Sequence, residues 1–170
     1  MTPARFVHTN LIARNWRTPA AFYGEVFGCT PAGPERNLSG PEMDAGTGLP
    51  GVRLRGAHLR LPGHGSEGPT LEIFEYEPAA AGLPAQINRP GFGHIAFLVE
   101  DVAAARAAVL AAGGRDYGRT VSVPVPGAGT VTFVYVCDPE GNIIELQSWK
   151  PGNPPDGRVY SVDGGGHSSI

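Results

Sequence analysis

The sequence lacks long apolar runs and has few cysteines, and both absences exclude classes of protein. No apolar run approaches the roughly 18 residues that a membrane-spanning helix needs, so no membrane partner is expected. The opening stretch MTPARFVHTN has no apolar segment or cleavage site typical of a secretory signal, and we expect a cytoplasmic location. Cys29 and Cys137 form no CxxC or Cys/His motif, so we expect two reduced, structural thiols.

The sequence also lacks an excess of basic residues. Lys and Arg number 13 against 16 Asp and Glu, which gives a formal net charge of -3 and argues against a nucleic-acid partner. With 41% hydrophobic and 17% charged residues, the chain falls outside the disordered class. The 25 Gly and 17 Pro predict many turns. A chain of 170 residues is long enough to bury a substantial core.

The two halves of the sequence follow one pattern. When the first half of the sequence is shifted forward by 86 positions, Val7-His8 aligns with Gly93-His94, and Phe27-Gly28 aligns with Gly113-Gly114. Each copy starts as a strand with a histidine, continues as an Ala-rich helix and stops at glycine. The expected helix starts are Thr18-Pro19 in the first copy and Asp101, which caps residues 102–112, in the second.

The ends of the copies match as well, now at an offset of 73. Leu71-Glu72-Ile73 falls on Ile144-Glu145-Leu146, so each copy ends in a strand with a glutamate between apolar residues. Between start and end lie further strands, over 52–61 in the first copy and 130–136 in the second. The alternation in the first of these changes phase at Gly56, which predicts a β-bulge.

The predicted fold is α+β, with two tandem βαβββ modules forming a curved mixed sheet around a central cavity. The modules are expected over 5–78 and 91–150, followed by a loose tail over 151–170. The Gly/Pro-rich segment 30–51 is long for a connection, which leaves two interpretations: a lid over the site or a simple connector.

Four polar side chains face the interior if strand alternation holds. His8, Glu72, His94 and Glu145 each share a strand face with mostly apolar neighbours. A buried charge needs a partner, and a divalent cation is one. A single histidine or glutamate on a strand is more often structural than a metal ligand. A histidine and a glutamate at equivalent positions in both copies favour a metal site. The mixed N/O donor set suits Zn, Ni, Co, Mn or Fe(II).

Other ionisable residues are expected outside this site. His58, His64 and His167 are interpreted as bystanders, and Glu75 and Glu77 point away from Glu72 and are expected to be exposed. Two interpretations stay open for the strand arginines, either a solvated face or a grip on a substrate carboxylate or phosphate: Arg53, Arg55 and Arg60.

Three segments carry a family resemblance: AAFYGEVFG (20–28), GFGHIAFLVEDV (91–102) and DPEGNIIEL (138–146). With them, residues 6–149 resemble the vicinal oxygen chelate superfamily of glyoxalase I, methylmalonyl-CoA epimerase, extradiol dioxygenases, fosfomycin-resistance enzymes and bleomycin-binding proteins. The resemblance implies paired modules around one divalent metal ion held at the positions of His8, Glu72, His94 and Glu145. It also implies a homodimer, with each site built from one chain or from two.

Within this resemblance, the glutamate at position 72 favours the glyoxalase and epimerase branch. The function expected is a metal-dependent lyase or isomerase that acts on a small oxygenated substrate through a metal-stabilised enediolate, with Glu145 or Glu72 as the base. Ile12 and Tyr76 stand where glutathione-using members carry Arg and Asn, which argues against a glutathione cosubstrate.

Two alternatives from other classes stay open. One is an Fe(II) extradiol-type dioxygenase that uses His8, His94 and Glu145, with Glu72 as a spectator. The other is a non-catalytic protein that binds a small molecule such as an antibiotic. The ligand set argues against this last reading, because bleomycin-binding relatives generally lack it.

Overall fold

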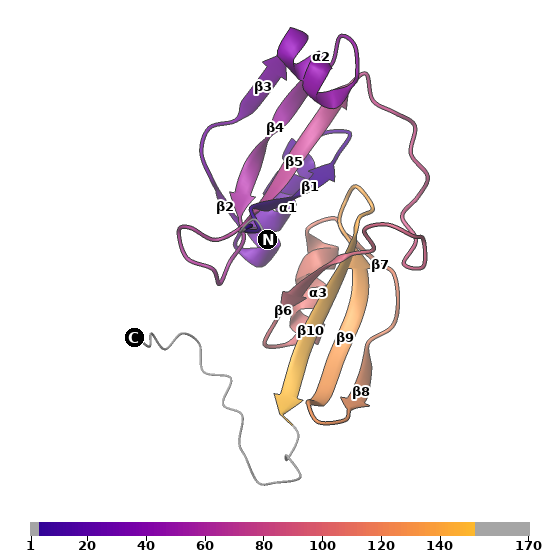
Figure 1. Cartoon of the computed structure of the whole chain (residues 1–170). Helices are drawn as coiled ribbons and strands as arrows, with labels where there is room; N and C mark the ends of the chain where they lie inside the picture. The colour runs from indigo at the N-terminus through magenta and orange to yellow at the C-terminus, as the bar shows by residue number, and fades with distance from the viewer. Residues whose placement is uncertain (1–3, 152–170) are drawn as a thin grey trace.

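One plan of strands and helices occurs twice along the chain in the computed structural model, which describes residues 4–151 (Figure 1). The first copy consists of β1 (His8–Ile12), α1 (Arg17–Phe27), β2 (Thr30–Pro31), β3 (Arg36–Ser39), α2 (Pro41–Thr47), β4 (Arg53–Arg60) and β5 (Thr70–Glu77). The second consists of β6 (Ile95–Leu98), α3 (Val102–Ala111), β7 (Arg115–Asp116), β8 (Val121–Val125), β9 (Gly129–Cys137) and β10 (Ile143–Pro151).

The two copies build sheets of identical topology. Each is a five-stranded mixed sheet, ordered β1-β5-β4-β2 in the first and β6-β10-β9-β7 in the second. The first and last strands of each copy pair in parallel, and the other pairs are antiparallel. In each copy the second strand is split in two, since β2 and β3 both pair with β4, while β7 and β8 both pair with β9. The α+β class with two tandem modules is confirmed, and the sheets are open and curved.

The segment 30–51 is not a lid. It contains β2, β3 and α2, and β3 pairs with β4 over Arg36–Ser39. Helix α2 starts with a proline and ends at Gly48, whose positive φ of 71° closes the helix. Met43 of this helix packs on a small core of Val52, Leu54 and Phe74. The segment therefore contributes two short strands and a helix to the first module, so it is neither a loose lid nor a simple connector.

The helix boundaries follow local signals, with one correction. Helix α1 starts at Arg17 with Trp16 at the N-cap, so Thr18-Pro19 lies inside the first turn and does not cap the helix. At the start of α3 the Asp101 carboxylate accepts hydrogen bonds from the amides of Ala103 and Ala104, as predicted, and the helix ends at Ala111.

Gly56 does not form a bulge. The β4–β5 register runs without interruption from Arg53↔Glu77 to Arg60↔Thr70. The phase of burial changes because opposite faces of β4 are covered in different places: Leu54 packs in the core under α2, whereas Ala57 and Leu59 pack in the main core with α1. A Cβ on Gly56 would lie 2.0 Å from the Ile73 carbonyl oxygen, so glycine is required by the close neighbouring strand.

The main core is shared by both modules. Phe27 at the end of α1 stacks on Phe97 of β6 with ring centroids 3.9 Å apart. The buried Tyr23 hydroxyl donates to Asp138 at 3.2 Å, and burial, followed by the charge of Asp138, raises the pKa of Tyr23 well above its ordinary value. The buried residues of this core come from both copies: Leu11, Ala13, Trp16, Phe22, Tyr23, Cys29, Ala57, Leu59, Leu71, Ile73, Val102, Val109, Val134, Val136, Ile144 and Leu146.

Three further expectations concern the cysteines, the membrane and the tail. Cys29 and Cys137 are buried free thiols, and burial raises the pKa of Cys29 to about 11. In residues 4–151 no helix has the length and apolar character needed to cross a membrane. The last strand extends to Pro151, and the predicted tail beyond it lies outside the described residues.

Candidate functional site

Three neighbouring strands of the first module bring two histidines and a glutamate together. His8 comes from β1, Glu72 from β5 and His58 from β4, where His58 is the direct cross-strand partner of Glu72. The His58 Nε2 atom lies 3.0 Å from Glu72 Oε1, and the His8 Nε2 atom lies 3.6 Å from Glu72 Oε2. We call these three residues the histidine cluster. Their face of the sheet is opposite the face that packs on α1.

Hydrogen bonds hold the side chains of the histidine cluster in place. Asn10 Nδ2 donates to Glu72 Oε2 at 2.7 Å, and His58 Nδ1 lies 3.1 Å from the Thr70 hydroxyl. Burial lowers the pKa of His58, and the neighbouring His8 lowers it further, although the charge of Glu72 opposes them. The Thr70 contact fixes the ring orientation and directs Nε2 at Glu72, to which an Nε2–H group can donate; in the tautomer with the proton on Nδ1, Nε2 can instead ligate a metal ion.

The second module carries a matching arrangement. His94 directly precedes β6, and its Nε2 atom lies 2.9 Å from Oε2 of Glu145 in β10. Tyr135 of β9 is the cross-strand partner of Glu145, and its ring lies 5.1 Å from that of His94. Burial and the Glu145 carboxylate raise the pKa of Tyr135, so the phenol stays protonated at neutral pH. We call the two ligand-type residues the His94–Glu145 pair.

His58 and Tyr135 are the polar residues that the sequence analysis missed. Each stands opposite the glutamate of its own module, on the strand next to it. The structure places His58, interpreted as a bystander, in contact with Glu72. The pairing register of the β4–β5 and β9–β10 hairpins places His58 and Tyr135 at equivalent positions. The loops that connect the two strands of each hairpin differ in length, so the offset of 73 that aligns Glu72 with Glu145 does not align His58 with Tyr135.

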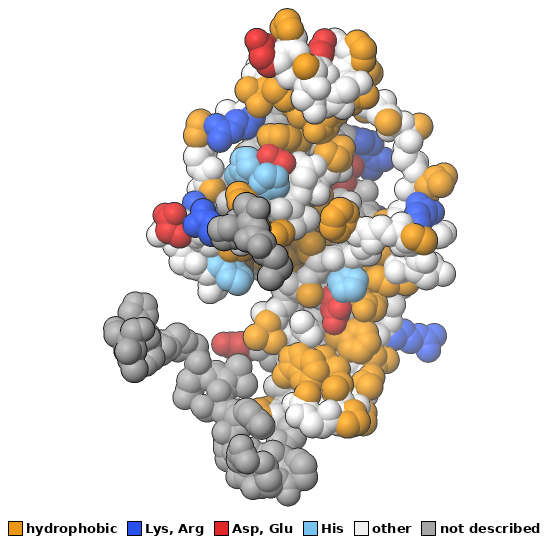
Figure 2. Space-filling view, in the orientation of Figure 1, with side chains coloured by type: hydrophobic (Ala, Val, Ile, Leu, Met, Phe, Trp, Pro, Cys, Tyr) orange, Lys and Arg blue, Asp and Glu red, His pale blue; other side chains and the backbone are white. Residues whose placement is uncertain are grey.

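The four predicted ligands form two separate groups in one chain. Within residues 4–151, the one group of three or more His, Cys, Asp or Glu whose ligand atoms all lie within 4.8 Å of one another is His8, His58 and Glu72. His94 and Glu145 contact each other but do not join it. Figure 2 shows pale blue histidines with red carboxylates beside them on both modules. The convergence of all four on one ion stays a prediction.

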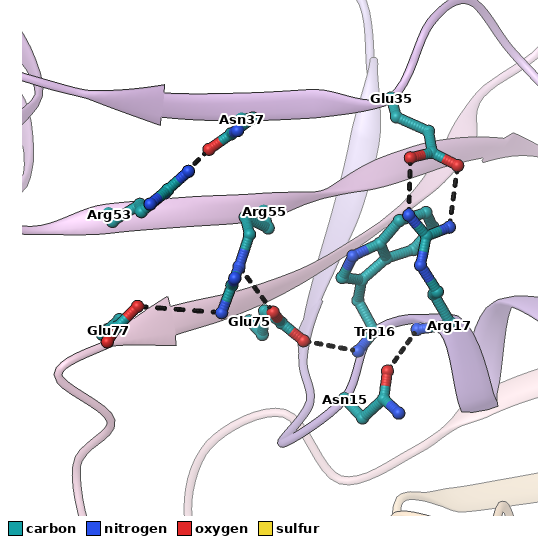
Figure 3. A network of polar contacts seen from close by, with 9 residues as sticks. All are labelled: Asn15, Trp16, Arg17, Glu35, Asn37, Arg53, Arg55, Glu75 and Glu77. Atoms are coloured by element: carbon teal, nitrogen blue, oxygen red, sulfur yellow. Dashed lines mark hydrogen bonds and ion pairs between the residues drawn. The ribbon is translucent and has the colours of Figure 1, made fainter.

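The arginines of β4 have different surroundings. Arg53 donates to Asn37 at 2.9 Å, and Arg55 pairs with Glu75 at 2.8 Å (Figure 3). Glu75 also accepts from the Trp16 amide and is largely buried, contrary to expectation, whereas Glu77 is exposed. Arg60 lies on the other face of the strand with His58. The structure therefore leaves only Arg60 of this set beside the histidine cluster.

The remaining histidines are His64 and His167. His64 is an exposed residue of the loop between β4 and β5, in keeping with its interpretation as a bystander. His167 lies outside the described residues.

Two cavities of the first module lie on opposite sides of its sheet. One of about 270 Å³ adjoins the histidine cluster, since His58 and Thr70 line it. The other, of about 450 Å³, lies on the opposite side of the sheet along α1 and is lined by Trp16, Ala20, Leu59 and other mostly apolar residues. The larger cavity is not the one next to the ligand-type residues, so the smaller one is the candidate for substrate binding.

Comparison with known proteins identifies the family. Residues 5–146 match the family model described as Glyoxalase/Bleomycin resistance protein/Dioxygenase superfamily. The chain belongs to this superfamily. No curated protein matches the chain.

Two solved structures share this fold, and a third is similar at a lower TM-score. A glyoxalase family protein from Bacillus cereus is 18% identical, with a TM-score of 0.71, over 88% of this chain and 96% of that chain. A glyoxylase/bleomycin resistance protein/dioxygenase domain from Frankia sp. EAN1pec is 17% identical, with a TM-score of 0.56, over 89% and 96%. The fosfomycin resistance protein FosX from Listeria monocytogenes, complexed with Mn(II) and sulfate ion, is 14% identical, with a TM-score of 0.48, over 88% and 94%.

The donor atoms in this superfamily member fit a divalent metal ion. Imidazole nitrogens and carboxylate oxygens suit Zn, Mn, Fe, Co and Ni, and the histidine cluster places three such atoms within 4.8 Å of one another. Asn10 and Thr70 contact two of these three residues from outside, as the outer partners of metal ligands do.

Proposed function

We propose that the chain is a divalent-metal-dependent enzyme of the glyoxalase-like type, a lyase or isomerase that acts on a small oxygenated substrate through an enediolate. The observation that carries this proposal is the pairing of a histidine with a glutamate at equivalent places in both modules, His8 with Glu72 and His94 with Glu145. A sheet face that carries two imidazole–carboxylate pairs is suited to holding a cation and to moving a proton.

His8, Glu72, His94 and Glu145 would hold the ion. Bound there, a divalent metal ion supplies Lewis-acid polarisation of a substrate oxygen and makes a neighbouring C–H more acidic. This set of nitrogen and oxygen donors suits Zn, Ni, Co, Mn and Fe and does not select one of them.

The proton transfer falls to a glutamate of the chain. Glu72 is held by Asn10 and His58, one on each carboxylate oxygen, which fixes its orientation. Glu145 is held at Oε2 by His94. Either carboxylate can accept the proton from the substrate C–H and return it to the neighbouring carbon, because both stand beside the proposed ion-binding position. Ile12 and Tyr76 offer no cationic group for the glutathione carboxylates, so a small substrate without glutathione is proposed.

A second copy of the chain would complete the site. The His94–Glu145 pair does not reach the histidine cluster within one described chain. Strands β1 and β6 stand at the ends of their sheets, and they expose Ile12 and Leu98, at 52% and 67% exposure. An exposed apolar sheet edge is usually covered by a partner. A dimer that places β6 of one copy beside β1 of the other would bring the two pairs together.

Substitution of the two glutamates tests the proposal. Glu72→Ala and Glu145→Ala should each remove bound metal or turnover in a screen of alpha-hydroxy ketones and hemithioacetals, whereas Glu77→Ala, an exposed position on the opposite face of β5, should retain both. Exchange of the substrate C–H with deuterated water should be lost together with turnover. Retention of metal and turnover in both glutamate variants would contradict the proposal.

A second candidate function is an Fe(II) dioxygenase. Many non-haem iron oxygenases use two histidines and one carboxylate, and the histidine cluster supplies such a set, with Glu72 as a ligand in place of the expected His8, His94 and Glu145. Oxygen uptake with catechols after anaerobic loading with Fe(II) would support this candidate. Full activity under argon with Ni or Zn would exclude it.

A further inference from the structure

The cavity of about 270 Å³ beside the histidine cluster is rich in arginine. Its lining includes Arg5, Arg36 and Arg60 together with His58 and Thr70. Arg5 precedes β1, Arg36 begins β3 and Arg60 ends β4, so three separate segments contribute an arginine to the lining of one concavity. We call it the arginine cavity. In Figure 2 basic side chains flank the pale blue histidines of the first module.

The charge of the arginine cavity is not balanced by the carboxylates around it. Glu67 is the one acidic side chain among its described lining residues. Within residues 4–151 the ion pairs of arginine involve other positions, such as Arg55 with Glu75. Arg60 donates one N–H to the Gly68 carbonyl at 2.9 Å, which fixes its side chain while leaving further donors free for a ligand. Gathering like charges is unfavourable unless an anion joins them.

The arginine cavity is continuous with the proposed metal site through His58. One side of the His58 ring contacts Glu72, and the residue also lines the cavity. A molecule bound in the cavity would therefore extend directly to the histidine cluster.

We propose that the arginine cavity binds the phosphate group of a small phosphorylated substrate, whose oxygen-bearing carbons then lie at the histidine cluster. This inference rests on the proposed function for the chemistry at the cluster, but the phosphate subsite itself depends only on the arginines. It gives the substrate class that the metal ligands alone leave open.

The number and kind of side chains favour phosphate over carboxylate. Three lining arginines against one lining glutamate match the charge of a dianion, and guanidinium groups suit the several oxygens of a tetrahedral group. The cavity volume, about 270 Å³, is below that of most drug-sized pockets and suits a compact ligand.

Binding of methyl phosphate to the metal-free full chain tests the subsite. After treatment with a chelator, the wild-type chain should bind methyl phosphate at one site, followed by calorimetry or ³¹P NMR. Arg36→Gln and Arg60→Gln should each raise the dissociation constant for methyl phosphate about tenfold or more, because each removes a charge-assisted hydrogen bond. Arg53→Gln, on the same strand as Arg60 but bonded to Asn37 on the other face, should bind like the wild type. Acetate should not displace methyl phosphate at equal concentration.

Three results would each overturn the inference: no binding of methyl phosphate by the wild-type chain, unchanged binding in both cavity variants, or displacement by acetate as effective as by methyl phosphate. Metal content measured on the same samples separates this inference from the proposed function. The cavity variants should bind metal like the wild type, since none of the four proposed ligands is changed. If the wild-type chain binds phosphate but no metal, the proposed function is contradicted and the phosphate subsite is supported. If it binds metal but no phosphate, the phosphate subsite is contradicted and the proposed function is supported.

Discussion

At the residue scale, the two glutamates of the proposed site differ in what stands opposite them. Glu72 faces His58, and Glu145 faces Tyr135. The first glutamate thus has a second imidazole beside it, while the second has a phenol that stays protonated at neutral pH. The histidine cluster is therefore the richer half in ligand atoms, and we expect it to be the tighter-binding half of the site.

His58→Ala should lower divalent-metal affinity about 10–100-fold, because removing either a ligand or the partner that orients a ligand has an effect of this size. His64→Ala is the matched control, since His64 is exposed in a loop and contacts none of the cluster. The measurement is a competitive titration with Mn²⁺ and a chromophoric chelator. Equal affinity in His58→Ala and the wild type would exclude His58 from the site.

The site residues that could be predicted from the sequence differ from those that could not in the kind of information that identifies them. His8, Glu72, His94 and Glu145 could be proposed because the duplication repeats a His and a Glu at defined places. His58 could not, because its role depends on the β4–β5 register, which brings position 58 opposite position 72. Arg36 was missed for a similar reason: β3 lay inside a segment expected to be a loop.

At the element scale, local signals predicted α1, α3 and the last strands, but they missed α2 and the second strands. Asp101 caps α3 through two amide hydrogen bonds, a signal that needs no distant partner. The short strands β2 and β3 consist largely of exposed residues, so they show no apolar alternation. Their pairing with β4 is a tertiary contact, and for this reason the sequence suggested a lid where the structure has sheet.

Gly56→Ala should destabilise the protein by about 1–3 kcal/mol, because a Cβ at this position would lie 2.0 Å from both the Ile73 carbonyl oxygen and a ring carbon of Phe74. Gly46→Ala is the opposite case. Gly46 lies in α2 with no atom within 4 Å of the added Cβ, so the substitution should be neutral or stabilise by up to about 1 kcal/mol. Urea unfolding followed by circular dichroism measures both changes. A Gly56→Ala protein as stable as the wild type would contradict the close β4–β5 contact.

At the scale of the whole molecule, the shared core joins the modules while their ligand groups stay apart. The Phe27–Phe97 stack and the Tyr23–Asp138 hydrogen bond cross from one module to the other. The sequence predicted two modules and their relation by duplication, but the way they pack depends on which apolar surfaces meet. Strand alternation fixes only the face on which a side chain stands, and it leaves open which chain completes the site.

The measurement that tests the central claim most directly is metal binding by a mixture of two variants. His8→Ala/Glu72→Ala removes the ligands of the first module, and His94→Ala/Glu145→Ala removes those of the second. Our account predicts that neither variant alone binds a divalent ion tightly, and that after subunit exchange each mixed dimer regains about one ion, because one of its two sites is then intact. It is contradicted if the mixture binds no more metal than the separate variants, or if either variant alone binds metal like the wild type.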